Sequence, residues 1–293
     1  MMELKYRHVD VFTDSPFSGN GLTVFILEET LSTELMQEIT REMRQFESIF
    51  LFPTEKPDTF QARVFTMEEE LDFAGHPTLG ATCVLHEKFF PNKDSSTWTI
   101  CFNHKESLVK TTFQENRFFA SMEQGIPEFG ETLSDDEIET FLSALNLSKP
   151  DLDANFPLEV ISLGLPYLIV PVRQNLEKAK ISVGNFEEML ERIGAKFVYV
   201  FDLGKFEGRT WDNDGRVEDA ATGSAAGPTG VYLFRQGLIE ADEETVLNQG
   251  SFVGRPSKLL VKVGGTKDEI ISVKVSGEIV MMAKGIFDEK VIR

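Results

Sequence analysis

Asp72-Phe73-Ala74-Gly75-His76-Pro77-Thr78-Leu79-Gly80 is the stretch of this 293-residue chain that says most about its fold. A strand-like segment runs into Ala74-Gly75, and His76 and a proline suited to the first turn of a helix follow. The start of a helix exposes backbone N–H groups without intrahelical acceptors and the positive end of the helix dipole. We therefore expect Gly75 and His76 to open a helix whose N-terminus can receive a carboxylate.

A second stretch of this kind lies about half a chain later, in Glu218-Asp219-Ala220-Ala221-Thr222-Gly223-Ser224-Ala225-Ala226-Gly227. Its Thr222-Gly223-Ser224 supplies a tight turn, a hydroxyl group and another helix N-terminus. Other segments repeat at separations of about 146 to 149 positions: Glu47–Phe52 corresponds to Lys196–Phe201, Arg63–Phe65 to Arg209–Trp211, and Gly75–Thr78 to Gly223–Ala226. This common spacing and order predicts two halves of similar fold.

Hydrophobic periodicity predicts the same order of elements in both halves. In the first half we expect strands at Tyr6–Phe12, Thr23–Leu27, Ile49–Phe52, Phe60–Phe65, Thr97–Phe102, Ser107–Phe113 and Phe118–Glu123, with helices at Thr33–Arg44, capped by Ser32, and from Gly75. In the second half we expect strands at Leu158–Ile161, Tyr167–Val172, Phe197–Asp202 and Leu259–Val263, with helices at Asn185–Ile193 and Ser224–Gln236. Gly125–Leu133 reads as the linker, followed by a helix that opens at Ser134. Mixed strands with one long helix per half predict an α+β architecture.

Composition and charge limit the classes of function. Apolar residues make up 41% of the chain and charged residues 26%, as in a folded globular protein. The net charge of -19 and the absence of a basic stripe argue against binding of nucleic acid or of an anionic membrane. No apolar run approaches the roughly 20 residues that cross a bilayer, and Met1–Asp10 lacks the pattern of a secretory signal. Two cysteines are too few for a disulfide scaffold, so we expect a reduced, cytoplasmic protein.

A carboxyl group is the most reactive candidate in the first half. Glu47, within Gln45–Phe50, stands at the start of an apolar strand, where partial desolvation is expected to raise its pKa towards neutrality. A carboxyl tuned in this way can both accept and donate a proton. Structural alternatives stay open: Glu47 as a solvated edge charge, His76 as a helix cap, and Asp219 as a turn residue that bonds its own backbone.

No cofactor is indicated by the sequence. The four histidines, His8, His76, His86 and His104, have no metal-ligand spacing. Gly19-Asn20-Gly21 lacks the strand, glycine triplet and helix of a nucleotide fingerprint. We expect a small-molecule ligand and neither a metal nor a cofactor.

At these motifs the chain resembles the phenazine-biosynthesis F-like (PhzF-like) isomerase family, which shares the fold of diaminopimelate epimerase. The resemblance spans nearly the whole chain and rests on Val9–Thr13 with Pro16–Asn20, the Glu47 strand, Phe73–Gly80, Glu218-Asp219 with Thr222–Ala226, Gly254–Ser257 and Val275–Gly277. It implies two pseudo-symmetric halves, each a barrel-like mixed β-sheet around a central helix. The halves would be 1–123, joined by a C-terminal strand at about 279–293, and 124–278, with the active site in the cleft between them.

The same resemblance implies roles for individual residues. The acid at Glu47 would move the proton, and His76 and Asp219 would hold or polarise the substrate. Asn20 and the amides around Gly75, Gly223 and Ser224 would bind the substrate, receiving its carboxylate or carbonyl. The sequence departs from the family pattern around the acid, where Phe46-Glu47-Ser48-Ile49-Phe50 stands in place of the usual Ser-Glu-Thr-Thr-Phe, and at Ala220 and Gly21, where proline is common. These changes bear more on the identity of the substrate than on the type of reaction.

Cysteine placement separates two branches of this fold. Its epimerases and racemases carry one catalytic thiol at the helix start of each half, whereas this chain has Gly75-His76 and Thr222-Gly223-Ser224 there. A two-thiol racemase is therefore disfavoured. The leading hypothesis is a cofactor-independent isomerase in which Glu47, as a single acid/base, moves a proton between carbons of a small carboxylate or carbonyl metabolite. The competing hypothesis is a catalytically lapsed member of the fold that binds a metabolite or a protein. The family resemblance further implies a homodimer.

Overall fold

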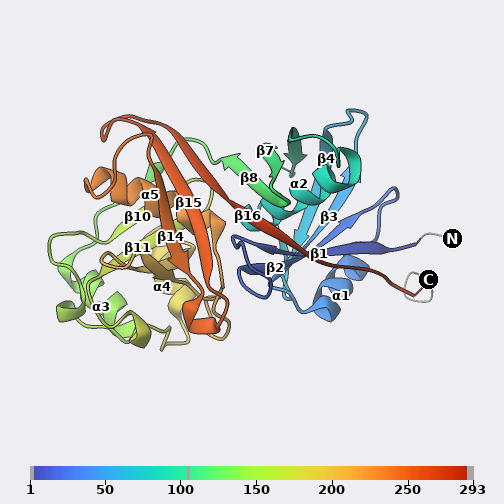
Figure 1. Cartoon of the computed structure of the whole chain (residues 1–293). Coiled ribbons are helices and arrows are strands. Elements are labelled where there is room, and N and C mark those ends of the chain that lie inside the picture. Colours follow the sequence, from blue (N-terminus) through green and yellow to red (C-terminus); the bar gives the residue numbers. More distant parts are fainter. Residues whose placement is uncertain (1–2, 104–105, 289–293) are drawn as a thin grey trace. The chain divides into compact units, whose positions relative to one another are not determined.

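The structure, a computed structural model, describes residues 3–103 and 106–288, so Met1, Met2, His104, Lys105 and residues 289–293 lie outside it. The chain divides into two compact units (Figure 1). Unit 1 comprises Met1–Glu123 and Ser276–Arg293, and unit 2 comprises Gln124–Val275.

Unit 1 is a mixed sheet with two helices. Its elements are β1 (Lys5–Val11), β2 (Asn20–Ile26), α1 (Thr33–Met43), β3 (Glu47–Pro53), β4 (Thr59–Phe65), β5 (Glu70–Leu71), α2 (Gly75–Phe89), β6 (Ser95–Cys101), β7 (Glu106–Gln114) and β8 (Arg117–Glu123), with the C-terminal part of β16 (Ile270–Ile286). Its strand order runs β1-β2-β3-β4-β6-β7-β8-β16, and β16 pairs in turn with β1. This last pairing closes the sheet into a barrel.

Helix α1 covers the outside of this sheet. The Ser32 side chain accepts a hydrogen bond from the N–H of Leu35, which caps the helix as expected. The apolar face of α1, with Met36 and Ile39, packs on the aromatic rings of Phe25, Phe50 and Phe65. Phe25 and Phe50 stack at 4.7 Å on the parallel strands that α1 connects. This aromatic layer fixes the register between β2 and β3 and therefore the place of Glu47.

Helix α2 is central to unit 1. It is buried along most of its length and contacts β1, β2, β3, β6, β7 and β8. Gly80 permits the close approach, since a Cβ there would lie 2.7 Å from Leu22 and 2.9 Å from Val11. The glycine of the quoted motif therefore lets the helix pack directly on the barrel strands.

Unit 2 repeats the plan with other side chains. Its elements are β9 (Glu128–Phe129), α3 (Asp135–Ala144), β10 (Glu159–Ser162), β11 (Pro166–Val172), α4 (Phe186–Arg192), β12 (Phe197–Asp202), β13 (Glu207–Arg209), α5 (Gly223–Arg235), β14 (Glu244–Gln249), β15 (Ser257–Gly265), the first residues of β16, and short 3-10 helices at Lys149–Asp151, Leu176–Lys178 and Ser251–Val253. The strand order is β15-β14-β13-β12-β11-β10-β9. Helix α5 packs on β10, β11 and β15, as the central helix of this unit.

Strand pairing shows the duplication directly. In unit 1, β2 pairs parallel with β3 across α1, β3 antiparallel with β4, and β4 parallel with β6 across α2. In unit 2, β11 pairs parallel with β12 across α4, β12 antiparallel with β13, and β13 parallel with β14 across α5. The α+β class and the two similar halves expected from the sequence are confirmed.

Some expected segments differ from the structure. The predicted linker Gly125–Leu133 contains the short strand β9, which pairs with β10. Strands β13 and β14 were not predicted, and β13 has only three residues. The C-terminal strand expected at about 279–293 is part of β16, a 17-residue strand that begins earlier, at Ile270, and runs through Gly277 and Gly285. Pairing with distant strands, rather than local pattern, determines these elements.

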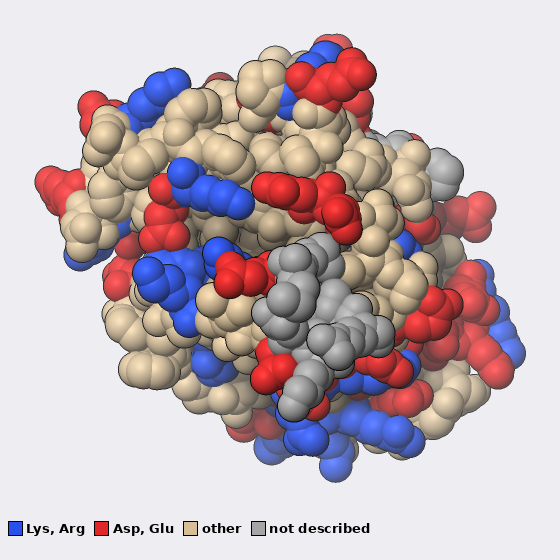
Figure 2. Space-filling view, turned by 90° about the vertical axis from the view of Figure 1, so that its right-hand side faces the viewer, with Lys and Arg blue, Asp and Glu red and all other residues tan. Residues whose placement is uncertain are grey.

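Charge is mixed on the face shown in Figure 2, where blue Lys and Arg side chains and red Asp and Glu side chains are interspersed among uncharged residues. Within the described residues, the helices fall short of the length and hydropathy needed to span a membrane.

Candidate functional site

Glu47 and His76 meet inside unit 1. The Oε2 atom of Glu47 lies 3.3 Å from Nδ1 of His76. The residues are 7% and 4% exposed, so the solvated edge charge considered for Glu47 is wrong. Asn20 contributes a third polar group, because its Nδ2 lies 3.5 Å from the same Nδ1. Three predicted site residues thus form one buried cluster.

Strand pairing places this cluster. Glu47 is the first residue of β3 and lies in register with Leu22 of the parallel strand β2, whose first residue is Asn20. Gly19, just before Asn20, has φ +67°, and a Cβ there would lie 2.4 Å from the carbonyl oxygen of Val11. Only glycine suits this tight return of the chain. The starts of two parallel strands therefore carry Asn20 and Glu47 to the start of α2.

The first turn of α2 presents backbone donors. The N-cap residue is Ala74, with extended backbone and no side-chain cap, so His76 does not cap the helix. Pro77 has no N–H, which leaves the N–H groups of Gly75 and His76 as the donors at this helix start. With the dipole of a helix that spans 15 residues, this end can bind an anionic group.

Burial keeps the His76 imidazole neutral. Desolvation lowers its pKa from 6.5 to about 3. With Glu47 ionised, the carboxylate beside Nδ1 favours the tautomer that carries its proton on Nδ1. The Nε2 atom then presents a lone pair, and it is buried without a hydrogen-bond partner among the described residues. A buried polar atom without a partner is costly unless a ligand or water satisfies it, so Nε2 is suited to accept a hydrogen bond from a ligand.

A second cluster lies at the start of α5 in unit 2. Asp219 is buried, and its Oδ2 accepts a hydrogen bond of 2.5 Å from the hydroxyl of Thr222, the residue before the helix. This bond is of the local kind considered from the sequence, although its donor is a side chain and not backbone. The helical geometry leaves the N–H groups of Gly223 and Ser224 without intrahelical acceptors.

Two side chains that the sequence did not suggest support this helix start. The Tyr167 hydroxyl lies 2.8 Å from Oγ of Ser224, and Gln124 donates a hydrogen bond of 2.9 Å to the carbonyl of Gly223. Gly227 makes room for Gln124, since a Cβ on it would overlap the amide oxygen of that side chain. No local pattern points to these contacts, because they join positions 57 and 99 residues apart.

A buried ion pair precedes Asp219. Arg209 binds both carboxylate oxygens of Glu218, at 2.9 and 2.6 Å, and its Nη1 also donates to the carbonyls of Leu176, Glu177 and Ala179. Its guanidinium lies over the ring of Trp211. Glu218 is therefore engaged in holding the chain before Asp219.

Both cysteines lie in unit 1, on α2 and β6. Burial raises the pKa of the Cys83 thiol, and burial together with the carboxylate of Glu106 raises that of Cys101. Raised pKa values keep both groups as thiols, whereas a catalytic pair needs a thiolate. The geometry and the chemistry are both unlike those of a two-thiol racemase.

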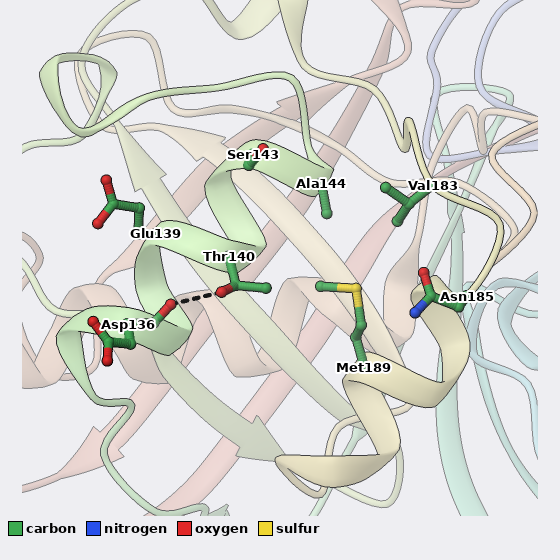
Figure 3. Close-up of a pocket in the computed structure, with 8 residues that line it drawn as sticks. All are labelled: Asp136, Glu139, Thr140, Ser143, Ala144, Val183, Asn185 and Met189. Atoms are coloured by element: carbon green, nitrogen blue, oxygen red, sulfur yellow. Dashed lines mark hydrogen bonds between the residues drawn. The ribbon is translucent and has the colours of Figure 1, made fainter.

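One pocket of unit 2 is a groove between α3 and α4. Figure 3 shows Thr140 and Met189 facing one another across it, with Val183 and Asn185 at one end and the acids Asp136 and Glu139 at the other. The predicted site residues lie outside it. We assign no function to this groove.

Comparison with known proteins gives one consistent result. The PhzC-PhzF family, described as phenazine biosynthesis-like protein, matches residues 9–285. A trans-2,3-dihydro-3-hydroxyanthranilate isomerase of Pseudomonas chlororaphis is 32% identical over 96% of this chain and 98% of its own length. The isomerase YddE of Salmonella typhimurium, itself uncharacterized, is 29% identical over 96% and 97%. The family resemblance inferred from the motifs is confirmed.

Solved structures agree with this match. A protein of Pseudomonas aeruginosa described as a predicted epimerase has 44% identity and a TM-score of 0.91, over 97% of this chain and 99% of that one. A PhzF-family phenazine biosynthesis protein of Bacillus anthracis has 25% identity and a TM-score of 0.84, over 98% and 100%. A probable proline racemase of Agrobacterium radiobacter, at 13% identity and a TM-score of 0.64 over 98% and 93%, shares the fold. The racemase and epimerase fold expected from the sequence is thus confirmed.

Proposed function

Because the chain belongs to the PhzC-PhzF family, whose curated relatives named above are isomerases, we propose that it is a cofactor-independent isomerase. In this proposal it moves a proton between two carbons of a small metabolite that bears a carboxylate or carbonyl group. The observation that carries the proposal is the buried contact between Glu47 and His76, with Nε2 of His76 available to a ligand.

Glu47 is the single acid and base of the proposed reaction. Its carboxylate removes a proton from a carbon made acidic by a neighbouring carbonyl or extended double-bond system. The same group returns the proton to another carbon on the same face, so the net reaction is a shift of a C–H bond with the double bonds. General acid–base catalysis by a placed side chain contributes about 10²- to 10⁴-fold to the rate.

His76 and Asp219 orient the substrate. The neutral imidazole accepts a hydrogen bond at Nε2, and the Asp219 carboxylate accepts one from a hydroxyl or amine. Asn20 and the amides of Gly75, Gly223 and Ser224 bind the carboxylate or carbonyl and stabilise the charge that develops there.

Trans-2,3-dihydro-3-hydroxyanthranilate is the first probe, since it is the substrate in the name of a relative at 32% identity. It carries the features required above: a carboxylate, an amine, a hydroxyl and a conjugated system. Ser48 and Ile49 beside the acid differ from the family pattern. A different compound with the same chemical features is therefore an equal candidate for the substrate. A homodimer and a cytoplasmic location accompany the proposal, and sedimentation and fractionation of the native protein check them.

Untargeted activity profiling tests the proposal without knowledge of the substrate. Wild-type protein and Glu47→Gln are incubated in heavy water with the probe and, separately, with a metabolite extract, and products are followed by mass spectrometry and NMR. The expected result is one metabolite that changes structure without change of composition, apart from deuterium, with the wild type alone. If a metabolite binds both proteins but neither converts it, the lapsed binding protein is the correct reading. If no metabolite is altered by the wild type, the proposed activity is overturned.

A further inference from the structure

Gln249 is the most completely bonded side chain near the predicted site residues, although it belongs to no motif of the sequence. It ends β14 and is 1% exposed. Its Nε2 donates to the carbonyl of Asp219 at 2.8 Å and to the hydroxyl of Thr222 at 2.9 Å. Its Oε1 accepts from the N–H of Thr222 at 3.0 Å and from the hydroxyl of Tyr199 at 3.1 Å. The amide thus uses two donors and two acceptor sites, its full capacity.

The orientation of this amide follows from its partners. The carbonyl of Asp219 can only accept, and the backbone N–H of Thr222 can only donate. A flipped amide would place its oxygen against the carbonyl oxygen of Asp219. It would also place its N–H groups against the backbone N–H of Thr222. Gln249 therefore has one allowed orientation, with Nε2 towards the Thr222 hydroxyl.

This orientation determines where the Thr222 proton goes. A hydroxyl that accepts from Nε2 has its own proton free to donate, and Oδ2 of Asp219 lies 2.5 Å away. A hydroxyl donor favours the ionised, acceptor form of a carboxylate. The bonds thus run in one direction, from Gln249 to Thr222 to Asp219.

We propose that Gln249 and Thr222 are positioning residues that hold Asp219 as an oriented carboxylate acceptor. Gln249 makes three hydrogen bonds to Asp219 and Thr222 in the turn before α5. Ser257 holds the same segment through a hydrogen bond of 2.9 Å to the carbonyl of Ala220. The turn therefore cannot shift without breaking buried bonds. The hydrogen-bond arrangement itself does not depend on any activity of the protein. Its importance for turnover rests on the proposed function, in which Asp219 contacts the substrate.

The run of hydrogen bonds from Gln249 through Thr222 to Asp219 (the relay) can be tested directly by NMR. The carboxyl carbon of Asp219 reports the protonation of that side chain as the pH is lowered. Spectra of protein with labelled aspartate are assigned through Asp219→Asn and recorded from pH 7 downwards. In Thr222→Val, which keeps the shape and removes the donor, we expect the midpoint for Asp219 to rise by about one pH unit. Thr222→Ser restores the donor and should return the midpoint towards that of the wild type. Gln249→Met removes the group that orients the hydroxyl, together with its bonds to the backbone of Asp219 and Thr222 and to Tyr199, but leaves the Thr222 hydroxyl in place, so it should give a smaller rise.

Thr229→Val is the matched control. It makes the same substitution at a buried hydroxyl inside α5, the helix that Thr222 precedes, and that hydroxyl donates to the carbonyl of Ala225 at 2.8 Å. A purely structural effect of losing a buried hydroxyl would appear in both valine variants, whereas the relay predicts a midpoint shift at Thr222 alone. A folded Thr222→Val protein with an unchanged midpoint overturns the proposal. If that variant fails to fold, unchanged midpoints in Gln249→Met and Thr222→Ala overturn it equally.

Turnover gives the second readout, and it separates the two proposals. Once a substrate is found, Thr222→Val should raise KM or lower kcat by about tenfold, with recovery in Thr222→Ser. A shifted midpoint in a protein that converts nothing would leave the relay standing and refute the isomerase. An unshifted midpoint in an active isomerase would refute the relay and support the isomerase.

Discussion

Nδ1 of His76 lies 3.3 Å from Oε2 of Glu47, and the two residues come from the first turn of a central helix and the first residue of a parallel strand. Neither side chain reaches bulk solvent to any large extent. A base and a neutral hydrogen-bond acceptor are thus held side by side by backbone elements rather than by mobile loops. This rigidity makes substitutions at the pair informative.

Glu47→Gln tests the acid/base group. The amide keeps the shape of the side chain and can still accept a hydrogen bond, but it cannot carry a proton between carbons. We expect kcat to fall by about 10²- to 10⁴-fold while ligand affinity stays close to that of the wild type. Steady-state kinetics and calorimetry measure the two quantities. Near-normal turnover in this variant would refute the role given to Glu47.

His76 should weaken the folded state in acid. Its pKa is 6.5 when unfolded and about 3 when folded, so between these values the unfolded chain binds the extra proton. Stability therefore falls as pH drops through this range, by up to about 1.4 kcal/mol per pH unit from this group. His76→Asn removes the group from both states, and its stability should fall less steeply between pH 6.5 and 4.5. Urea unfolding at several pH values gives the slopes, and equal slopes would contradict the burial effect.

The thiols should be dispensable. Burial raises the pKa of both, and both lie in one unit, so they cannot act as a pair with one member in each half. We expect Cys83→Ala with Cys101→Ser to retain turnover, with a stability loss of about 1 kcal/mol from the small cavity at Cys83. Kinetics and thermal unfolding of the double variant measure both. Loss of turnover in a folded double variant would revive the two-thiol mechanism.

Local sequence was sufficient to predict the elements that begin with a clear signal. Ser32 and Ser134 cap their helices as expected, the latter in a capping box with Glu137. The glycine motifs open α2 and α5 where the repeat predicted. Caps and glycine turns act within a few residues, so they are visible in the chain itself.

The supporting contacts could not be predicted in the same way. Gln249 bonds Thr222 and Tyr199 across 27 and 50 residues, and its own neighbours Asn248 and Gly250 give no indication of that role. Strand β9 depends likewise on its partner β10, which lies further along the chain. Tertiary pairing determines such features, and a single sequence without its fold does not display it.

Arg209 should be the most costly charge to remove. The side chains of Arg209 and Glu218 are only 10% and 9% exposed, and Arg209→Met would leave the Glu218 carboxylate buried without its partner. We expect a stability loss of about 3–5 kcal/mol, measured by urea unfolding. Arg209→Lys should recover part of it, since one ammonium cannot replace both bidentate bonds and those to three carbonyls. Arg216→Met is the control, because the Arg216 side chain is 81% exposed in its pair with Asp214 and its loss should cost less than about 1 kcal/mol. Equal losses at Arg209 and Arg216 would show that the buried pair does not hold the segment before Asp219.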